Sequence, residues 1–323
     1  MLAPDSAGRS CEETAAGWYK YENNPVLGGS LGTCFDVALL KEDDRYRMWF
    51  SWRPKDSVAL VESPDGAHWS TPVIVLEPNR ETGWERRINR PVVVKNADGY
   101  HMWYTGQSRD HSWIGYAQST DGVAWRRVSS RPVISPEESW EKAAVMCPHV
   151  IWDEKDRVFR MWYSGGEQYE PDAVGYATSL DGQAWTKHSD NPVFRADEHN
   201  PREQHKVTAC QVVQDHDWHL MFYIGFRDEH RAQIGVARSR DGISNRERHP
   251  ANPVIFPGRG KARKSAGGTC RPRLSPVTTT CADSPGMDRS SGSPTIPTSN
   301  ATARLIDLTF VPQITARLRR SLE

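Results

Sequence analysis

The chain of 323 residues has no excess charge of either sign, because 41 lysines and arginines balance 41 aspartates and glutamates. No global field therefore draws it to nucleic acid or to an anionic membrane surface. It has no apolar run as long as a transmembrane helix, and its first residues lack the basic and apolar regions of a signal peptide. These absences predict a cytoplasmic protein without nucleic-acid or membrane partners, and they leave its oligomeric state open.

Metal-binding spacings and helical periodicity are also missing. None of the six cysteines belongs to a Cys-x-x-Cys pair, so the residue pattern predicts no metal site and no cofactor. Cys34, Cys147 and Cys210 lie among apolar residues, which favours reduced and buried thiols. Without helical periodicity, the expected secondary structure is β-strand.

What the sequence does have is a long internal repeat. Its fullest copy, 160–185, is RMWYSGGEQYEPDAVGYATSLDGQAW, and further copies cover 47–69, 101–125 and 219–244. Each contains an apolar run that starts with Met and ends in an aromatic residue, followed by Ser-x-Asp-Gly, and the Asp-Gly pairs are 56, 60 and 60 residues apart. Asp-Gly between two short β-rich runs predicts a hairpin, because both residues tolerate a positive φ.

Each copy, with the apolar strand before it, predicts four antiparallel strands, which is the composition of a propeller blade. Segments of the Asn-Pro-Val type precede the repeats, and we take them as blade openings. They begin at Asn24, Thr71, Arg131, Asn191 and Asn252. Five openings predict an all-β, five-bladed propeller over 18–258, with four complete blades and the start of a fifth, after a disordered N-terminus over 1–17.

Residues 259–323 form an atypical tail, with no aromatic residue between 261 and 303. One interpretation is a disordered tail rich in Ser, Thr, Pro, Arg and Gly. The other is a gene that is out of frame from about Gly260, because the shifted frame permits a Trp and a Trp-Tyr pair spaced like Trp84 and Trp103-Tyr104. In both cases the fifth blade is incomplete or replaced by this tail.

Three acids are our candidates for catalysis, because they occupy matching positions at strand ends that face the centre of a propeller. Asp36 is a nucleophile or general base, or else a strand-end cap. Glu167 follows two glycines and is a general acid, or else a solvated loop residue. Asp228 is a substrate ligand, or else the ion-pair partner of Arg227. Glu203 is a reserve acid on a looser segment.

Polar residues at matching positions of the other repeats are candidates for substrate binding. They are Arg53, Asn89, Arg90, Gln107, His149, Lys206 and Arg227. Arg90 and Lys206 have the alternative role of pairing with Asp36, and His149 that of a structural histidine. The Asp-Gly and Trp residues after each blade are expected to form turns and core.

Paired carboxylates are the chemistry of glycoside cleavage, in which their separation decides between retention and inversion. The Asn-Pro-Val segments, the Met-Trp-Tyr strand, the Asp-Gly hairpin and Asp36 together resemble the five-bladed propeller glycosidase superfamily. That group contains arabinanases and xylosidases of family 43, invertase-like fructosidases of families 32 and 68, and mannoside phosphorylases of family 130. The resemblance covers about 18–258. It implies a glycosidase-type site in the central funnel, with Asp36 as the acid of the first blade.

The sequence departs from these families at two motifs. Invertase-like members carry Arg-Asp-Pro in the second blade, where this chain has Asn89-Arg90-Pro91. They carry Glu-Cys-Pro in the third, where this chain has Met146-Cys147-Pro148. The Glu-Asp-Pro-Arg motif of mannoside phosphorylases is also missing. The resemblance therefore supports Asp36 alone, and it implies a channel Ca²⁺ only because some relatives hold one.

Three functions remain open from the sequence. The first is a glycoside hydrolase-like enzyme that acts on an oligosaccharide or glycoside through paired carboxylates. The second is a non-catalytic carbohydrate-binding propeller or an inactive, truncated relative. The third is a protein-interaction propeller, which the placement of polar residues toward a funnel disfavours. Both of the first two take a carbohydrate as partner.

Overall fold

The computed structural model describes residues 21, 23–168, 170–228 and 231–255. The expected disordered N-terminus, the rest of the fifth blade and the atypical tail lie outside these ranges. The described part is built of strands and three short 3-10 helices, η2 (Gly29–Leu31), η3 (Arg53–Lys55) and η4 (Arg80–Thr82). The prediction of an all-β chain is therefore confirmed.

The strands form four consecutive antiparallel units of four, which we call blades one to four. Blade one holds β1 (Cys34–Lys41), β2 (Tyr46–Trp52), β3 (Ser57–Ser63) and β4 (Val73–Leu76). Blade two holds β5 (Arg87–Asn96), β6 (Gly99–Ser108), β7 (His111–Ser119) and β8 (Arg126–Arg127). Blade three holds β9 (Ala144–Asp153), β10 (Val158–Glu167), β11 (Glu170–Ser179) and β12 (Thr186–Lys187), with β13 (Phe194–Arg195) beside β11. Blade four holds β14 (Lys206–Asp215), β15 (Trp218–Asp228), β16 (Arg231–Ser239) and β17 (Glu247–Arg248).

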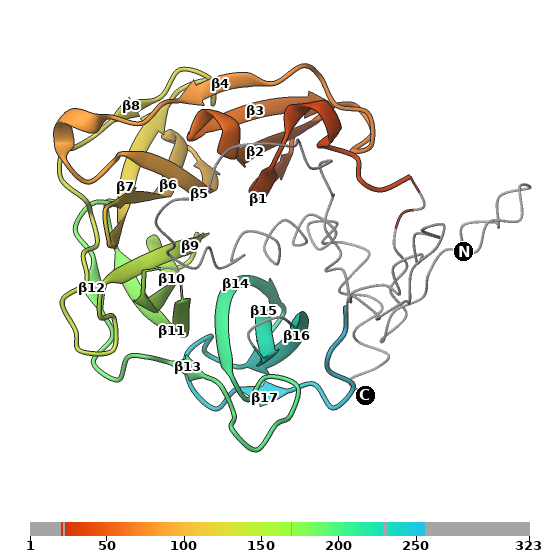
Figure 1. The fold of residues 1–323 in the computed structure, drawn as a ribbon, viewed down its shortest axis with the longest axis vertical. Helices are drawn as coiled ribbons and strands as arrows, with labels where there is room; N and C mark the ends of the chain where they lie inside the picture. The colour runs from red at the N-terminus through yellow and green to blue at the C-terminus, as the bar shows by residue number, and fades with distance from the viewer. Residues whose placement is uncertain (1–20, 22, 169, 229–230, 256–323) are drawn as a thin grey trace, which may run out of the picture.

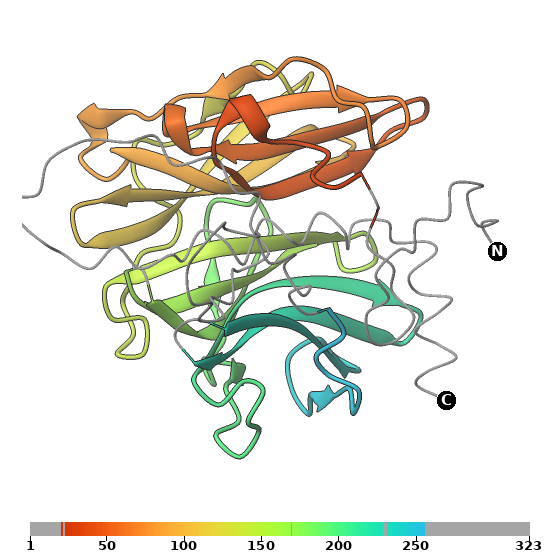
Figure 2. The same cartoon turned by 45° about the vertical axis from the view of Figure 1, so that its right-hand side comes forward.

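The blades lie around a common centre in chain order, with β1, β5, β9 and β14 innermost (Figures 1 and 2). Each innermost strand contacts the innermost strand of the next blade. Blades two and three are further joined by one parallel bridge, Ser112 to Ala144, so that their strands count as one nine-stranded sheet. This arrangement confirms the predicted propeller architecture of four-stranded antiparallel blades.

The core lies between blades, because each blade buries one face against its neighbour. Trp49 of blade one packs in a cluster with residues of blade two, such as Met102. Trp103 of blade two packs in the same way with Met161 of blade three, and Trp162 of blade three packs with blade four. All three tryptophans are fully buried. Burying such a side chain contributes about 2–3 kcal/mol, so the repeated aromatic supplies much of the cohesion between blades.

The same tryptophans tie each blade to the Asp-Gly turn of the next. The indole N–H of Trp49 donates to the carbonyl of Gly122 at 2.9 Å. Those of Trp103 and Trp162 donate to Gly182 and Gly242, also at 2.9 Å. The repeat therefore encodes a blade-to-blade hydrogen bond as well as a hairpin.

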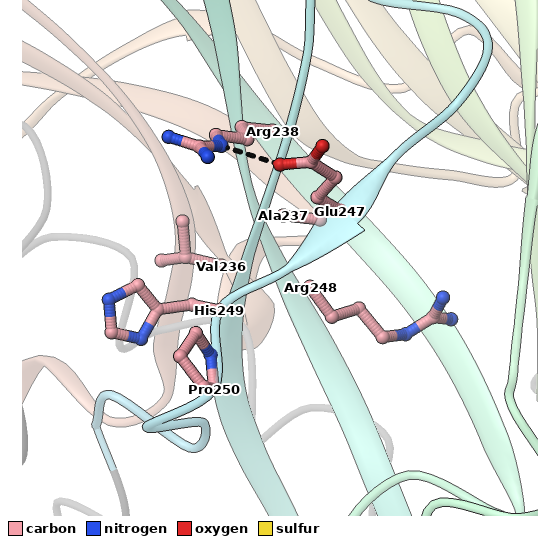
Figure 3. Close-up of a pocket in the computed structure, with 7 residues that line it drawn as sticks. All are labelled: Val236, Ala237, Arg238, Glu247, Arg248, His249 and Pro250. Carbon is pink, nitrogen blue, oxygen red and sulfur yellow. Dashed lines mark hydrogen bonds and ion pairs between the residues drawn. The ribbon is translucent and has the colours of Figure 1, made fainter. Parts of the chain in front are cut away.

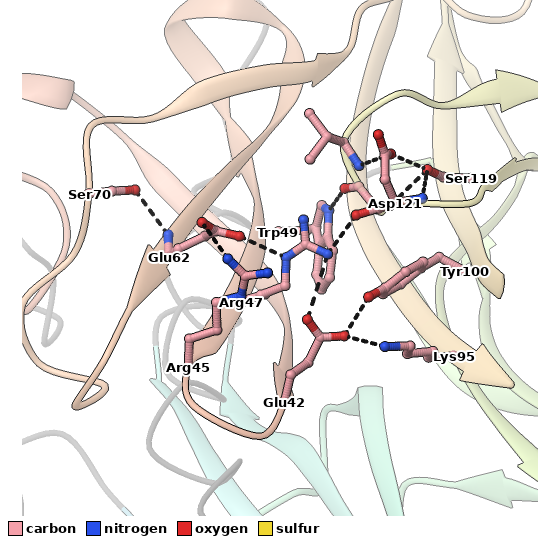
Figure 4. Close-up of polar contacts among 12 residues, drawn as sticks. Glu42, Arg45, Arg47, Trp49, Glu62, Ser70, Lys95, Tyr100, Ser119 and Asp121 are labelled. Carbon is pink, nitrogen blue, oxygen red and sulfur yellow. Dashed lines mark hydrogen bonds and ion pairs between the residues drawn. The ribbon is translucent and has the colours of Figure 1, made fainter.

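Figure 4 shows further polar contacts between blades one and two. Arg47 donates to the carbonyl of Asp121 at 2.7 Å and to Glu62 at 3.0 Å, and Glu42 accepts a hydrogen bond from Lys95 at 2.7 Å and another from Tyr100. The buried Arg47 guanidinium thus has partners on both blades, which fixes their relative position.

The Asp-Gly turns have the structural role that the sequence predicted. In blade two, the carboxylate of Asp121 accepts from the backbone N–H groups of Val123 and Ala124 at 2.8 Å and from the hydroxyl of Ser119 at 2.9 Å. These hydrogen bonds lower the pKa of Asp121 to about 2. Gly122 has a φ of 74°, which an L-residue with a side chain would adopt only with strain.

The Asn-Pro-Val segments differ from the prediction that they open blades. The strand after Asn191-Pro192 pairs with β11 of the preceding blade, and Ile134 and Ile255 form bridges to the third strands of their own preceding blades. The Asn191 side chain accepts from the backbone N–H of Tyr176 at 2.8 Å, which anchors the segment there. Hence these segments close blades, and Thr71-Pro72 leads into β4, the last strand of blade one.

Candidate functional site

Each innermost strand has, near its start, one residue with a positive φ, which we call its bulge residue. These are Asp36 (45°), Arg90 (54°), Cys147 (53°) and Ala209 (37°). The pairing register shifts at this point in β1, β5 and β14. A bulge re-aims the side chains beside it, and non-glycine residues at positive φ collect at functional sites. The four bulge residues therefore mark the end of the propeller where we place the candidate site.

A hydroxyl from the preceding blade holds three of these bulge residues. The backbone N–H of Arg90 donates to Ser51 at 2.7 Å, that of Cys147 to Thr105 at 3.1 Å, and that of Ala209 to Ser164 at 2.8 Å. The three hydroxyls occupy the same place in the repeat, directly after the apolar run of the second strand. The strained backbone is thus supported from the neighbouring blade.

Asp36 and Arg90 form a buried ion pair between blades one and two. The Nε atom of Arg90 lies 3.1 Å from a carboxylate oxygen of Asp36, and their side chains are only 8% and 5% exposed. This pairing is the alternative that the sequence left open for Arg90. It gives Asp36 a compensating positive charge, without which a buried carboxylate would be costly.

A chain of hydrogen bonds leads outward from this ion pair. Arg90 donates to the Asn89 side-chain oxygen at 2.6 Å, and the Asn89 amide donates to Gln107 at 2.8 Å. Gln107 in turn donates to Ser112 at 3.1 Å. Asp36, Arg90, Asn89 and Gln107, four predicted site residues, thus lie in one buried polar network.

Two further residues join the network through Arg90. The guanidinium groups of Arg53 and Arg90 lie 4.6 Å and 5.6 Å from the ring centre of Phe35. The surrounding protein and the charge of Arg90 lower the pKa of Arg53. Burial raises the pKa of the Cys147 thiol to about 11, although the adjacent Arg90 opposes this rise. Cys147 therefore lies beside the ion pair as a protonated thiol, and the sequence did not single it out for the site.

The two other predicted acids lie at the same end of the propeller, where the first strands begin and the second strands end. Glu167 ends β10, is 62% exposed, and lies 3.7 Å from Lys142. Asp228 ends β15, is 46% exposed, and lies 3.9 Å from Arg231. Neither has a contact with Asp36 among the interactions of the described residues. Both carboxylates are open to solvent, in contrast to the buried Asp36.

The remaining predicted residues are spread over blades three and four. Lys206 begins β14, is buried, and places its ammonium 4.6 Å from the ring centre of Phe226. Arg227 is exposed near the end of β15. His149 bonds the carbonyl of Val212 in the next blade at 2.9 Å, and burial lowers its pKa to about 4. This placement agrees with the structural alternative for His149.

A second set of acids forms a repeat that sequence reasoning missed. The buried carboxylates of Glu85, Glu141 and Glu203 each accept a hydrogen bond from the tyrosine that ends the apolar run of the second strand, and another from a cation on the fourth strand. The tyrosines are Tyr104, Tyr163 and Tyr223, and the cations are Arg127, Lys187 and Arg248. The three-fold recurrence shows that Glu203 is part of the scaffold.

Two adjoining pockets open beside the start of β5. One is lined by Asp56, Arg80, Arg86, Arg87, Gln107, Ser108 and Arg109, and has a volume of about 300 Å³. The other shares Arg80, Arg86, Ser108 and Arg109, adds Gly83, His111 and Trp113, and has a volume of about 560 Å³. We call them together the arginine pocket. Because Gln107 lines it, the network of Asp36 reaches solvent here.

A third pocket lies on the outer edge of blade four, away from this site. It is lined by residues 236–238 and 247–250 and has a volume of about 210 Å³ (Figure 3). Of its charged groups, Arg238 and Glu247 bond each other at 2.9 Å, and Arg248 donates to Glu203. The pocket therefore offers a ligand no uncompensated charge from this pair.

The described residues contain no group of three histidine, cysteine, aspartate or glutamate side chains placed to hold a metal ion. Asp36, the acid that the resemblance placed in the channel, faces a guanidinium instead. These residues do not fit a channel Ca²⁺. In the same part of the chain, no helix is long and apolar enough to cross a membrane.

Comparison with known proteins finds glycoside hydrolases among the proteins that this chain resembles. The profile of the glycosyl hydrolases family 32 N-terminal domain matches residues 37–192. A thermostable family-43 glycoside hydrolase has a TM-score of 0.60 at 17% identity, over 73% of this chain and 77% of its own. A structure described under the GH130 family of mannoside phosphorylases has a TM-score of 0.58 at 16% identity, over 80% of this chain and 84% of its own.

A curated relative comes from Mycobacterium tuberculosis (strain ATCC 25618 / H37Rv). The uncharacterized protein Rv1502 is 32% identical over 182 residues, which is 51% of this chain and 55% of that protein. The chain thus matches just over half the length of this relative. Together, the family profile and the structural neighbours support a glycoside hydrolase-like propeller superfamily, as the repeat and Asp36 indicated.

Proposed function

We propose that the chain cleaves a glycosidic bond at the central end of its blades, with Asp36 as nucleophile or general base. The observation that carries this proposal is the Asp36–Arg90 ion pair at 3.1 Å, on strained innermost strands and connected by hydrogen bonds to the arginine pocket. A carboxylate fixed in this way is pre-oriented, and its negative charge is compensated before a substrate binds.

The second carboxyl group of the reaction is Glu167 or Asp228. Both end second strands at the same end of the propeller as Asp36, and both are partly exposed. A general acid protonates the leaving oxygen as the bond breaks, while Asp36 attacks the anomeric carbon or activates water. Asn89, Gln107 and Arg53 offer amide and guanidinium groups to substrate hydroxyls. From blade four, Lys206 offers an ammonium group and Arg227 a guanidinium group.

The test is turnover of a panel of aryl glycosides and oligosaccharides by the full chain and its variants. Asp36→Asn should lower kcat/KM by roughly 10³-fold or more, the range for a group that acts on the reacting atoms. Because the substitution leaves Arg90 without its partner, Asp36→Asn/Arg90→Gln is made in parallel, and thermal unfolding checks that both fold. The exposed Glu154→Gln, on the opposite turn of blade three, is the matched control and should keep full activity.

Leaving groups of different basicity identify the general acid. Loss of the acid should slow the cleavage of alkyl glycosides and natural linkages by roughly 10²-fold or more. It should hardly affect dinitrophenyl glycosides, because their dinitrophenolate leaving group departs without protonation. Glu167→Gln and Asp228→Asn are compared in this way, and only one of them should show the pattern. Sugar binding without turnover in the wild-type chain would overturn the proposal and leave a carbohydrate-binding propeller.

A further inference from the structure

The arginine pocket has an unusual charge balance for a chain without net charge. Four arginines line it, at positions 80, 86, 87 and 109, against one carboxylate, Asp56. Asp56 lies 3.5 Å from Arg87, and both of these side chains are more than a third exposed. Among the ion pairs of the described residues, none involves Arg80, Arg86 or Arg109. The pocket therefore concentrates positive charge that its own residues do not balance.

Three different segments supply these arginines, and each segment is held in place. Arg80 opens η4, which Asn79 caps by accepting from the N–H of Glu81 at 3.1 Å. Arg86 and Arg87 lead into β5 beside the buried Asn89. Arg109 lies in the β6–β7 turn with a φ of 50°. The converging guanidinium groups are thus carried on fixed backbone.

The turn that carries Arg109 is fixed by the neighbouring blade. The amide of Gln168 donates to the carbonyl of Arg109 at 2.7 Å and to that of His111 at 3.1 Å. Gln168 is buried and directly follows Glu167, the last residue of β10. The end of β10 therefore fixes this turn as well as supplying Glu167.

One wall of the pocket is suited to a sugar ring. His111 and Trp113 stack with ring centres 5.6 Å apart and 22° between their planes. An aromatic face beside guanidinium groups offers apolar contact for a ring and paired hydrogen bonds for an oxyanion. Arginine matches carboxylate and phosphate groups with two parallel N–H donors, which lysine does not.

We propose that the arginine pocket is a subsite for an oxyanion, a phosphate or carboxylate group, that is carried by the saccharide substrate or binds beside it. The inference rests on the function proposed above, because it assigns the substrate class of that same site. Gln107 joins the two, since it lines the pocket and is two hydrogen bonds away from Arg90, the partner of Asp36.

The test is calorimetric titration of the full chain with four probes: inorganic phosphate, glucose 6-phosphate, galacturonate and neutral glucose. At least one anionic probe should bind at least tenfold more tightly than glucose, and the binding should weaken as salt screens the charges. Arg86→Gln/Arg109→Gln should weaken that binding by at least tenfold, because it removes hydrogen bonds to a charged group and these contribute strongly to the binding free energy. Arg126→Gln/Arg131→Gln removes the same charge from the outer edge of blade two and should change nothing.

The probes also distinguish the source of the oxyanion. Tight binding of inorganic phosphate indicates a separate anion beside the saccharide, whereas binding of a sugar phosphate or galacturonate alone indicates a charged substrate. Equal binding of all four probes, or unchanged binding in Arg86→Gln/Arg109→Gln, would overturn the subsite. Binding is measured without turnover, so the result does not depend on whether the chain cleaves a glycosidic bond. The subsite and the catalytic proposal can therefore fail independently.

Discussion

The buried acids of this chain differ in what surrounds them, and this separates scaffold from site at the level of single residues. Glu141 is fully buried and accepts from Tyr163 at 2.8 Å, from Lys187 at 2.7 Å and from two backbone N–H groups at 2.7 and 2.9 Å. Burial and the nearby carboxylate raise the pKa of Tyr163 far above its ordinary value. All of these contacts serve the fold.

We expect Glu141→Gln to destabilise the chain by about 2–4 kcal/mol, because Lys187 loses its buried partner and the amide cannot accept as many hydrogen bonds. Urea unfolding followed by tryptophan fluorescence measures the change, with Glu154→Gln as the exposed control. The specific activity of the folded fraction should stay as in the wild type. A loss of less than 0.5 kcal/mol would contradict this account of the scaffold acids.

The sequence could indicate Asp36 but not these scaffold acids. Asp36 precedes an apolar strand in the first repeat, and polar residues occupy the matching positions of later repeats. Alignment of the copies was therefore sufficient to indicate Asp36 as a candidate. Glu85 and Glu141 each follow a tryptophan, but Glu203 follows Arg202, and the first blade has Phe50 in place of the tyrosine. The motif therefore becomes visible only when the contacts to tyrosine and cation are known.

At the level of the strand, the hydroxyl after the apolar run of each second strand stabilises the next blade. Ser51, Thr105 and Ser164 accept the N–H of a bulge residue, and blade four has Ile224 at the matching position. The bulge also hides the start of a strand from sequence reasoning. The continuous apolar run begins at Pro91, beside the register shift, whereas β5 begins at Arg87.

We expect Ser164→Ala to cost about 1–2 kcal/mol, because it leaves the N–H of Ala209 buried without its hydroxyl partner. Ser164→Thr should recover most of this loss, since Thr105 already makes the same hydrogen bond in blade two. Urea unfolding measures both variants, and hydrogen exchange at Ala209 reports the local effect. Equal stability of the alanine and threonine variants would show that the hydroxyl makes no contribution.

For the whole molecule, the sequence repeat predicted the architecture because every blade buries the same aromatic position against the next. It did not predict the arginine pocket, because Arg80, Arg86 and Arg109 lie outside the strands and come together with Arg87 only when the strands pair. It also placed His149 toward the channel, whereas that ring bonds the carbonyl of Val212 and lies tilted against Trp162 between blades three and four.

This position of His149 makes the stability of the ring of blades dependent on pH. Burial lowers its pKa to about 4 in the folded state from the ordinary value of 6.5, so the unfolded chain binds more protons between these values. The contribution of neutral His149 to the free energy of unfolding is therefore wholly present above pH 6.5. It falls by about 3 kcal/mol as the pH drops toward 4. The pKa values of His101 and His219 are lowered by burial too, which adds to the loss in the same direction.

Urea unfolding at a series of pH values from 7.5 to 4 tests this expectation. His149→Gln keeps an amide donor for the Val212 carbonyl but removes the titrating ring, so its free energy of unfolding should depend less on pH than that of the wild type. The exposed His199→Gln is the matched control and should follow the wild-type curve. If His149→Gln and the wild type lose stability in parallel, protonation between blades three and four does not govern the acid sensitivity of the molecule.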